Sequence, residues 1–259
     1  MSEAVQEASE ELTKPFALIT GACGGIGQAL VLAFREAGYE VIGTDINPKP
    51  EDLAIDHFLQ IDLQKTVLNK TYAETVFNDI KKIVKGQGLR VLINNAATQI
   101  LGGTEKLNRD AWRETLDVNT LAPFFWTQAL LSELEKDTGS VINLSSIHAQ
   151  LTKREFVAYA TSKAALSGLT RALAVDLGGR IRVNAIEPAA IQTKMLEAGF
   201  EGNEDLLKEL HAAHPAGKIG LPEEVASFAV WLADKTKPFL TGTVVRLDGG
   251  IGGRLYDPA

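Results

Sequence analysis

The sequence has a single cysteine, no long apolar run and fewer basic than acidic residues. Because Cys23 is alone, no internal disulfide can form, and a reducing compartment is expected. The apolar runs are too short to cross a bilayer. There are 26 lysines and arginines against 33 aspartates and glutamates, so the net charge is -7 and neither nucleic acid nor an anionic membrane is expected as a partner. The N-terminus lacks the features of a signal peptide, which predicts a cytoplasmic protein.

Length and composition predict one globular α/β domain. The chain has 259 residues, of which 45% are hydrophobic and 23% charged, and it shows no domain linker, repeat or low-complexity segment. Residues 1–14 carry four glutamates and are predicted to form a solvated tail, so the domain is expected to span residues 15–259. The histidines have no metal-ligand spacing with cysteines or carboxylates, so no metal site is predicted.

A glycine-rich turn follows the first predicted strand. Residues 16–20 are almost wholly apolar, as in a buried parallel strand, and residues 21–27 read Gly-Ala-Cys-Gly-Gly-Ile-Gly before a helical stripe that runs to Gly38. Glycines allow the backbone to approach a pyrophosphate closely, and the N-terminus of a helix offers free N–H groups. The spacing differs from the commoner G-x-G-x-x-G, and a tight turn without a ligand is the alternative.

The next predicted strand, residues 40–45, ends on Asp45. A carboxylate about 20 residues after such a glycine turn can accept hydrogen bonds from both ribose hydroxyls of an adenosine. It would repel the additional phosphate of NADP, and no basic residue in the glycine turn compensates. This placement favours NAD.

Strands alternate with helices over the rest of the chain, which predicts a parallel, doubly wound sheet of seven strands. Five further strands are predicted at residues 58–61, 89–93, 140–145, 180–186 and 242–247. Helices are predicted at 65–84, at 108–134 with Asn108 as N-cap, and at 159–177. Residues 193–218 interrupt the alternation after the carboxyl end of a strand, where ligands bind in such sheets. This segment is predicted to be a lid over the substrate, with a surface excursion as the alternative.

Tyr159 and Lys163 are four residues apart on the helix at 159–177, so their side chains share one face. A nearby lysine charge favours the phenolate and is expected to lower the pKa of the phenol toward the range of acid/base work. Ser146, in the segment before, can orient a substrate oxygen. The pair alone is a weak signal, because tyrosine and lysine often occur at this spacing by chance.

In this order and context the motifs resemble the short-chain dehydrogenase/reductase family. The resemblance covers Phe16 to Gly250. In the first half of the chain it rests on the T-G-x3-G-x-G turn at 20–27, the N-N-A segment at 94–96 and Asn119. In the second half it rests on Ser146 thirteen residues before Tyr159, the Y-x-x-x-K pair, the turn from Pro188 to Thr193, L-P-E-E-V-A at 221–226 and the closing Asp248-Gly-Gly. The resemblance implies a single-domain, three-layer Rossmann fold and a homotetramer.

The resemblance also implies roles for individual residues. Tyr159 is the expected general acid/base, with Ser146 orienting the substrate, Lys163 holding the nicotinamide ribose, and Asn119 positioning a water that links Lys163 to solvent. His148 and Gln150 are expected to touch substrate, whereas Arg154 is interpreted as a solvated charge. The expected cofactor contacts are Gly21, Cys23, Gly24, Gly25, Ile26, Gly27, Asp45, Ile46, Asp62, Leu63, Asn94, Ala96, Tyr159, Lys163, Ile191 and Thr193.

Two departures from the family pattern concern backbone geometry. Ala189 and Ala97 stand where the family usually has glycine. If position 189 required a left-handed backbone, alanine would cost about 1–2 kcal/mol there. Cys23 is interpreted as a packing residue, because it has no base partner.

The function predicted is hydride transfer between NAD(H) and a secondary alcohol or ketone. The polar residues before Tyr159 indicate a polyol, sugar or hydroxyketone. An NADPH-dependent 3-oxoacyl (acyl-carrier-protein) reductase is the alternative within enzymes, and a non-catalytic dinucleotide sensor or scaffold is the alternative outside them. The C-terminal residues 254–259 are hypothesised to reach a neighbouring subunit's site.

Overall fold

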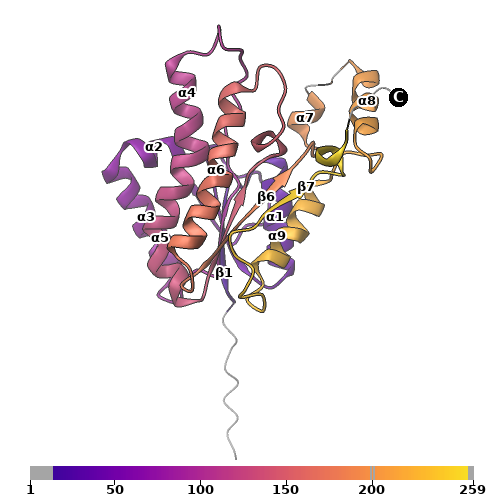
Figure 1. Cartoon of the computed structure of the whole chain (residues 1–259). Coiled ribbons are helices and arrows are strands. Elements are labelled where there is room, and N and C mark those ends of the chain that lie inside the picture. Colours follow the sequence, from indigo (N-terminus) through magenta and orange to yellow (C-terminus); the bar gives the residue numbers. More distant parts are fainter. Residues whose placement is uncertain (1–13, 199, 201, 256–259) are drawn as a thin grey trace, which may run out of the picture.

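Seven short apolar segments form one parallel sheet in the computed structural model, which describes residues 14–198, 200 and 202–255 (Figure 1). The strand order is β3-β2-β1-β4-β5-β6-β7. Their bounds are β1 Phe16–Thr20, β2 Glu40–Asp45, β3 His57–Gln60, β4 Val91–Asn94, β5 Ser140–Leu144, β6 Arg182–Pro188 and β7 Val244–Leu247. The order reverses between β1 and β4, so the carboxyl ends of these two strands flank the position where such sheets bind ligands.

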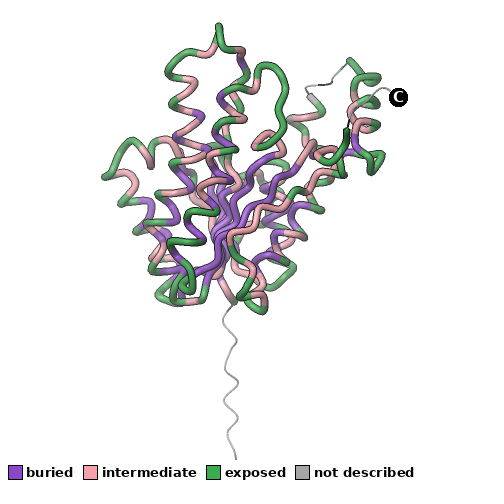
Figure 2. The backbone as a smooth tube through the Cα atoms, in the orientation of Figure 1, coloured by how far each residue is buried: buried purple, intermediate pink, exposed green. Residues whose placement is uncertain are grey.

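Helices cover both faces of the sheet, giving the three layers predicted. They are α1 Gly25–Glu36, α2 Leu63–Leu68, α3 Lys70–Val84, α4 Arg109–Leu116, α5 Ala122–Lys136, α6 Val157–Asp176, α7 Lys194–Ala198, α8 Glu204–Ala213 and α9 Pro222–Ala233. In β1, Phe16 and Leu18 pack into the apolar cluster beneath α3, α5 and α6, whereas Ala17 and Ile19 pack beneath α1 and α9. Burial on both faces explains why β1 reads as a continuous apolar run. Figure 2 shows the strands as the buried centre of the molecule.

Two predicted helices are interrupted. The helix predicted at 65–84 breaks at Asn69, whose Oδ1 accepts the Tyr72 N–H and caps α3 at 3.0 Å. The helix predicted at 108–134 does begin after Asn108, which caps α4, but a π-turn at Asp117–Leu121 separates α4 from α5. Apolar residues recur at helical spacing through both interruptions, so the sequence pattern does not reveal where the helices break.

The predicted lid segment forms α7 and α8, which lie beyond the carboxyl ends of β6 and β7 (Figure 1). Residues 199 and 201 within it lie outside the described residues, as do most of the predicted N-terminal tail and residues 256–259 of the C-terminal segment. No helix in the described part of the chain combines the length and apolarity needed to span a bilayer. The same residues contain no cluster of histidine, cysteine and carboxylate groups able to hold a metal ion.

Candidate active site

The turn from β1 to α1 is built by glycines that approach other backbone closely. Gly21 has a φ of +66°, and a Cβ there would lie 2.8 Å from the Cα of Ala96. A Cβ on Gly27 would overlap the carbonyl oxygen of Gly21, and one on Gly25 would lie 2.8 Å from Cγ2 of Thr193. A Cβ on Gly24, the N-cap of α1, would make only an ordinary contact with the Gly21 carbonyl oxygen at 3.5 Å, and Gly24 supplies no side-chain cap. No side chain of the cap residue therefore bonds to the first N–H groups of α1. These N–H groups can donate to a phosphate instead.

Asp45 lies at the end of β2, beside this turn. One carboxylate oxygen accepts the Cys23 N–H at 2.9 Å, and the other accepts the Asn47 N–H at 2.9 Å. The carboxylate thus fixes the glycine turn as well as carrying a charge. Burial and the neighbouring Asp45 carboxylate raise the pKa of the Cys23 thiol to about 11, so it stays protonated at neutral pH, as the interpretation of a packing residue requires.

The N-N-A segment holds the opposite side of the turn, through Asn95 rather than Asn94. Asn95 Nδ2 donates to the carbonyl oxygens of Thr20 and Gly21 at 2.9 and 3.0 Å. Thr20 Oγ1 in return accepts the N–H groups of Asn95 and Ala96. The Asn94 amide instead donates to Asn143 within the sheet. Sequence reasoning missed Thr20 and Asn95, although both stand within the quoted motifs.

Three other predicted cofactor positions lie at the carboxyl ends of β2 and β3. Ile46 is 61% exposed directly after β2, which leaves its side chain free to cover a ligand. Asp62 caps α2, where its carboxylate accepts the Lys65 N–H at 3.1 Å. Leu63 begins α2 and packs at the border of the apolar core. The capping bond gives Asp62 a structural task that the sequence had not indicated.

Ser146, Tyr159 and Lys163 meet where β5 ends and α6 passes over it. The Ser146 hydroxyl accepts the backbone N–H of His148 at 3.2 Å and forms a hydrogen bond with the Tyr159 phenol. Lys163 shares the helix face of Tyr159, with Nζ 5.7 Å from the centre of the phenol ring. The Lys163 ammonium donates to the Leu144 carbonyl oxygen at 2.7 Å and is almost wholly buried.

Burial dominates the acid/base properties of this pair. It lowers the pKa of Lys163 to about 7, because a buried ammonium loses its hydration. It raises the pKa of the Tyr159 phenol, and the hydrogen bond with Ser146 acts in the opposite direction. The sequence-based expectation was that the lysine charge lowers the pKa of the phenol. In this arrangement Ser146 is the neighbour that does so, and burial outweighs it.

Asn119 lies in the π-turn, fully buried beneath α6. Its Oδ1 accepts the Thr98 N–H at 2.8 Å, and its Nδ2 donates to the Thr98 carbonyl oxygen and to Ser162 Oγ at 2.9 and 3.0 Å. Ser162 Oγ in turn donates to the carbonyl oxygen of Tyr159 at 2.7 Å. Both amide hydrogens of Asn119 and one lone pair of Oδ1 are used in these contacts, which join the segment after β4 to the helix that carries Tyr159. The second lone pair of Oδ1 can still accept a hydrogen bond from a water.

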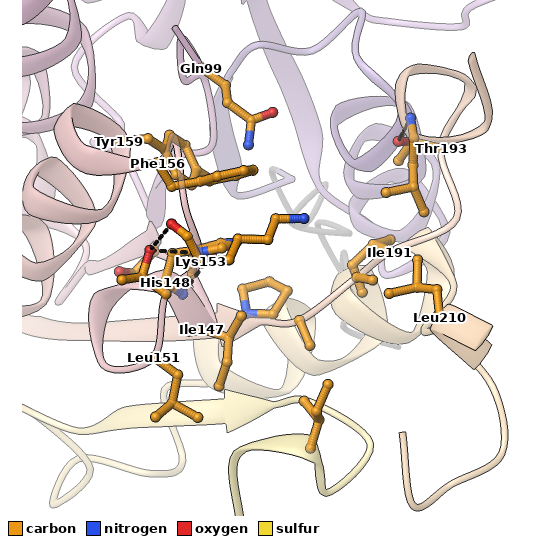
Figure 3. A pocket seen from close by; sticks show the side chains of 18 of the residues that line it. Gln99, Ile147, His148, Leu151, Lys153, Phe156, Tyr159, Ile191, Thr193 and Leu210 are labelled. Carbon is orange, nitrogen blue, oxygen red and sulfur yellow. Dashed lines mark hydrogen bonds between the residues drawn. The ribbon is translucent and has the colours of Figure 1, made fainter. Parts of the chain in front are cut away.

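A cavity of about 860 Å³ opens in front of Tyr159 (Figure 3). It is lined by Ser146, Tyr159 and His148, by the apolar side chains Leu101, Ile147, Leu151, Phe156 and Ile251, and by Ile191, Thr193, Leu196, Phe200, Leu210 and His214 from β6 onward. Ile26 from the glycine turn also lines it, so the cavity joins the turn to the tyrosine.

Of the four residues predicted to contact the substrate, Ser146, His148 and Tyr159 line the cavity, whereas Gln150 does not. The amide of Gln150 donates to the Glu187 carboxylate at 2.7 Å, and Gln150 is not among the described lining residues. Ala97 and Ala189 do not have positive φ angles, and neither alanine is strained where the family usually has glycine.

Sequence comparison decides the family. A family model described as enoyl-(acyl carrier protein) reductase matches residues 21–252. An NAD-dependent glycerol dehydrogenase of Listeria innocua serovar 6a is 32% identical over 92% of this chain and 94% of its own. The 3-oxoacyl-[acyl-carrier-protein] reductase FabG of Thermotoga maritima is 34% identical over 90% and 96%. The chain belongs to the short-chain dehydrogenase/reductase family.

Solved structures agree with this assignment. Ligand-free aldohexose dehydrogenase of Thermoplasma acidophilum has a TM-score of 0.86 at 29% identity, covering 95% of this chain and 97% of that one. A 4-hydroxyisoleucine dehydrogenase complexed with NADH and ElxO with NADP bound each give 0.83 at 28% identity, covering 93% of this chain and 100% of theirs. The protein is an NAD(P)-dependent oxidoreductase that acts on CH–OH groups.

Proposed function

We propose that this oxidoreductase prefers NAD(H) and interconverts a secondary alcohol and a ketone. The observation that carries the preference is Asp45, whose carboxylate is held at the end of β2 by the N–H groups of Cys23 and Asn47. A fixed negative charge here favours ribose hydroxyls, which donate hydrogen bonds, over a 2′-phosphate, which it repels. Gly24 supplies no positive charge that would offset this repulsion.

The residues at the glycine turn fit a dinucleotide. The N-terminus of α1 has no side-chain cap, and Gly21, Gly25 and Gly27 keep the backbone accessible where any Cβ would clash. In the proposed complex the turn and the α1 N-terminus hold the pyrophosphate. Ile191 and Thr193 lie beside the nicotinamide, and Lys163 lies at its ribose. Once bound, the nicotinamide supplies or accepts the hydride.

Proton transfer is assigned to Tyr159. In reduction its phenol donates a proton to the carbonyl oxygen, and in oxidation the phenolate accepts one from the alcohol. The His148 N–H occupies one acceptor site of Ser146 Oγ, and the Ser146 hydroxyl lies beside the Tyr159 phenol. In the proposed complex this hydroxyl turns its hydrogen to the substrate oxygen. Lys163, with its pKa of about 7, can exchange a proton at neutral pH. Asn119 positions the helix that carries Tyr159.

The cofactor preference is tested by fluorescence titration with NADH and NADPH. Asp45→Asn is the sharpest variant, because the amide keeps an oxygen acceptor for Cys23 but removes the charge. We expect the wild type to bind NADH at least about tenfold more tightly than NADPH. In Asp45→Asn the ratio of the two affinities should be clearly smaller. Asp52→Asn, at an exposed residue after β2, is the matched control. Equal binding of both cofactors by the wild type would favour the NADPH-dependent 3-oxoacyl reductase instead. Binding of cofactor without turnover of any alcohol or ketone would favour a dinucleotide sensor.

We further propose that residues 193–218 close over the substrate. Leu196, Phe200, Leu210 and His214 line the same cavity as Tyr159, which supports this role. Closure predicts that NADH slows proteolytic cleavage within this segment, which peptide mapping would detect. Unchanged cleavage would contradict it.

We also propose a cytoplasmic homotetramer. Apolar side chains stand exposed on α9 and near it, with Trp231 48% exposed and stacked on Phe228, and with Phe239 fully exposed. Exposed apolar surface of this kind supports subunit contacts. Sedimentation velocity measures the assembly, and a monomer at micromolar concentration would contradict it.

A further inference from the structure

Lys153 brings a positive charge into the substrate cavity. It lies in the loop between β5 and α6, and Figure 3 shows its side chain extending into the cavity. Its Nζ lies 4.7 Å from the centre of the Phe156 ring, a cation–π contact that holds the ammonium at the cavity wall. The position of this charge is therefore set by the position of Phe156.

Phe156 is itself fixed relative to Tyr159. Its ring stacks on His148 with centroids 4.3 Å apart and planes at 10°, and it meets the Tyr159 ring edge-on at 6.1 Å. The backbone before it is tied down as well, because the Gly102 N–H donates to the carbonyl oxygen of Glu155 at 2.8 Å. Glu155 has a φ of +70°, an uncommon conformation that this contact helps to hold. The Phe156 ring therefore contacts both the Lys153 ammonium and Tyr159, the residue proposed to transfer the proton.

The charge of Lys153 has no counterpart in the cavity. The described lining residues include no aspartate or glutamate, and none of the ion pairs among the described residues involves Lys153. Burial and the Lys153 charge both lower the pKa of His148, so this histidine is neutral at pH 7. In a chain of net charge -7, the cavity is a local positive site.

We propose that Lys153 binds a carboxylate of the substrate, which makes hydroxy- and oxo-carboxylic acids the substrate class of this site. The inference rests on the proposed function, because it places the substrate carboxylate near the alcohol or ketone group with which Tyr159 exchanges a proton. A single ammonium suits a singly charged carboxylate better than a phosphate, because phosphate sites gather several donors and the described lining contains no arginine. The apolar side chains around it suit the hydrocarbon part of such an acid.

The test compares acids with neutral substrates of the same shape. The pairs are 3-hydroxybutyrate with 3-hydroxybutyramide and 3-hydroxyhexanoate with 3-hydroxyhexanamide. The variants are Lys153→Met, which keeps most of the side-chain length, and Lys153→Arg, which keeps the charge. Arg154→Met is the matched control, because Arg154 is the exposed neighbour and is not among the described lining residues.

The wild type should prefer each acid to its amide, and Lys153→Met should lower kcat/KM for the acid about tenfold or more while changing that for the amide less than about twofold. The loss should fall mainly on KM, because the carboxylate is bound equally in the ground and transition states. Lys153→Arg should restore most of it. Raising NaCl should raise KM for the acid in the wild type and not in Lys153→Met. Equal losses for acid and amide would overturn the proposal, as would an amide preference in the wild type.

Two binding measurements separate this proposal from its alternatives. Titration with NADH tests whether Lys153 serves a cofactor phosphate, and a weakened NADH affinity in Lys153→Met would overturn the substrate assignment. Calorimetric titration of the enzyme–NADH complex with hexanoate and hexanamide needs no turnover. A hexanoate preference that is lost in Lys153→Met supports the anion site even if no alcohol is oxidised, in which case the proposed function alone fails. If the wild-type enzyme–NADH complex binds hexanoate and hexanamide equally well, the proposed anion site itself is wrong.

Discussion

Replacing Lys163 by methionine should remove a specific pH dependence from the stability of the protein. The Lys163 ammonium is 2% exposed and donates to the Leu144 carbonyl oxygen, and burial lowers its pKa to about 7. In the unfolded chain the same group has a pKa of about 10.4. Between these two values the unfolded state holds a proton that the folded state has lost. The free energy of unfolding must therefore rise with pH across this window.

The size of the effect follows from the two pKa values. The slope approaches about 1.4 kcal/mol per pH unit above the folded pKa and vanishes below it. Between pH 6 and pH 9 the wild type should gain about 2.5 kcal/mol from this residue alone. Methionine fills a similar volume and does not titrate, so Lys163→Met should lack this gain.

Urea unfolding at pH 6, 7.5 and 9, followed by circular dichroism at one fixed protein concentration, measures the gain. The quantity of interest is the wild-type free energy of unfolding minus that of Lys163→Met at each pH, which cancels the other titrating groups. Lys208→Met, at an exposed lysine of α8, is the control and should run parallel to the wild type. If the Lys163→Met profile also runs parallel, within about 0.5 kcal/mol, the buried lysine is charged throughout and the argument is wrong.

Three further predictions concern the phenol and the glycine turn. Tyr159→Phe should lower kcat about 10²- to 10⁴-fold in steady-state assays while leaving NADH affinity within about threefold, and a small kcat effect would remove Tyr159 from proton transfer. Gly27→Ala should abolish NADH binding or unfold the turn, because its Cβ would overlap the Gly21 carbonyl oxygen, whereas Gly24→Ala should bind NADH normally. Asn95→Ala leaves two backbone carbonyls without their donor, so it should cost about 1–3 kcal/mol in urea unfolding; an unchanged midpoint would contradict this.

The first two strands could be predicted residue by residue, because both of their faces are buried. The predicted bounds of β1 and β2 match the structure, and the parallel order follows from the alternation with helices. β4, β6 and β7 each start two residues later than predicted, whereas β3 starts one residue earlier. Leu89 is buried, but its N–H donates to the carbonyl oxygen of Glu133 at the end of α5 and not to a strand. Gly242 has a φ of +76°, which the backbone of a strand does not allow. Apolar character identifies burial in these cases but not the hydrogen-bond partner.

In the candidate site, too, the sequence predicts which residues lie together but not which hydrogen bonds they form. Spacing alone places Tyr159 and Lys163 on one helix face, as the structure has them. Their pKa values depend on burial that no spacing shows, and burial raises that of the phenol. Gln150 was expected at the substrate, but its amide meets Glu187, a fully buried carboxylate within β6. Glu187 directly follows the apolar residues Ala185 and Ile186, and this position was the available signal that a buried acid required a partner.

The walls of the cavity explain why the substrate was the least predictable part of the site. The residues proposed for proton transfer lie just after β5 and on α6, which are close together in the chain, so a local motif contains them. Thr193 shows the opposite case. It begins the lid segment, yet its methyl group occupies the space that a side chain at Gly25 would need, far away in sequence. A movement of the lid that displaces Thr193 must also change the packing against the glycine turn. Cofactor binding and cavity shape are therefore expected to be coupled at this contact, whatever substrate the cavity selects.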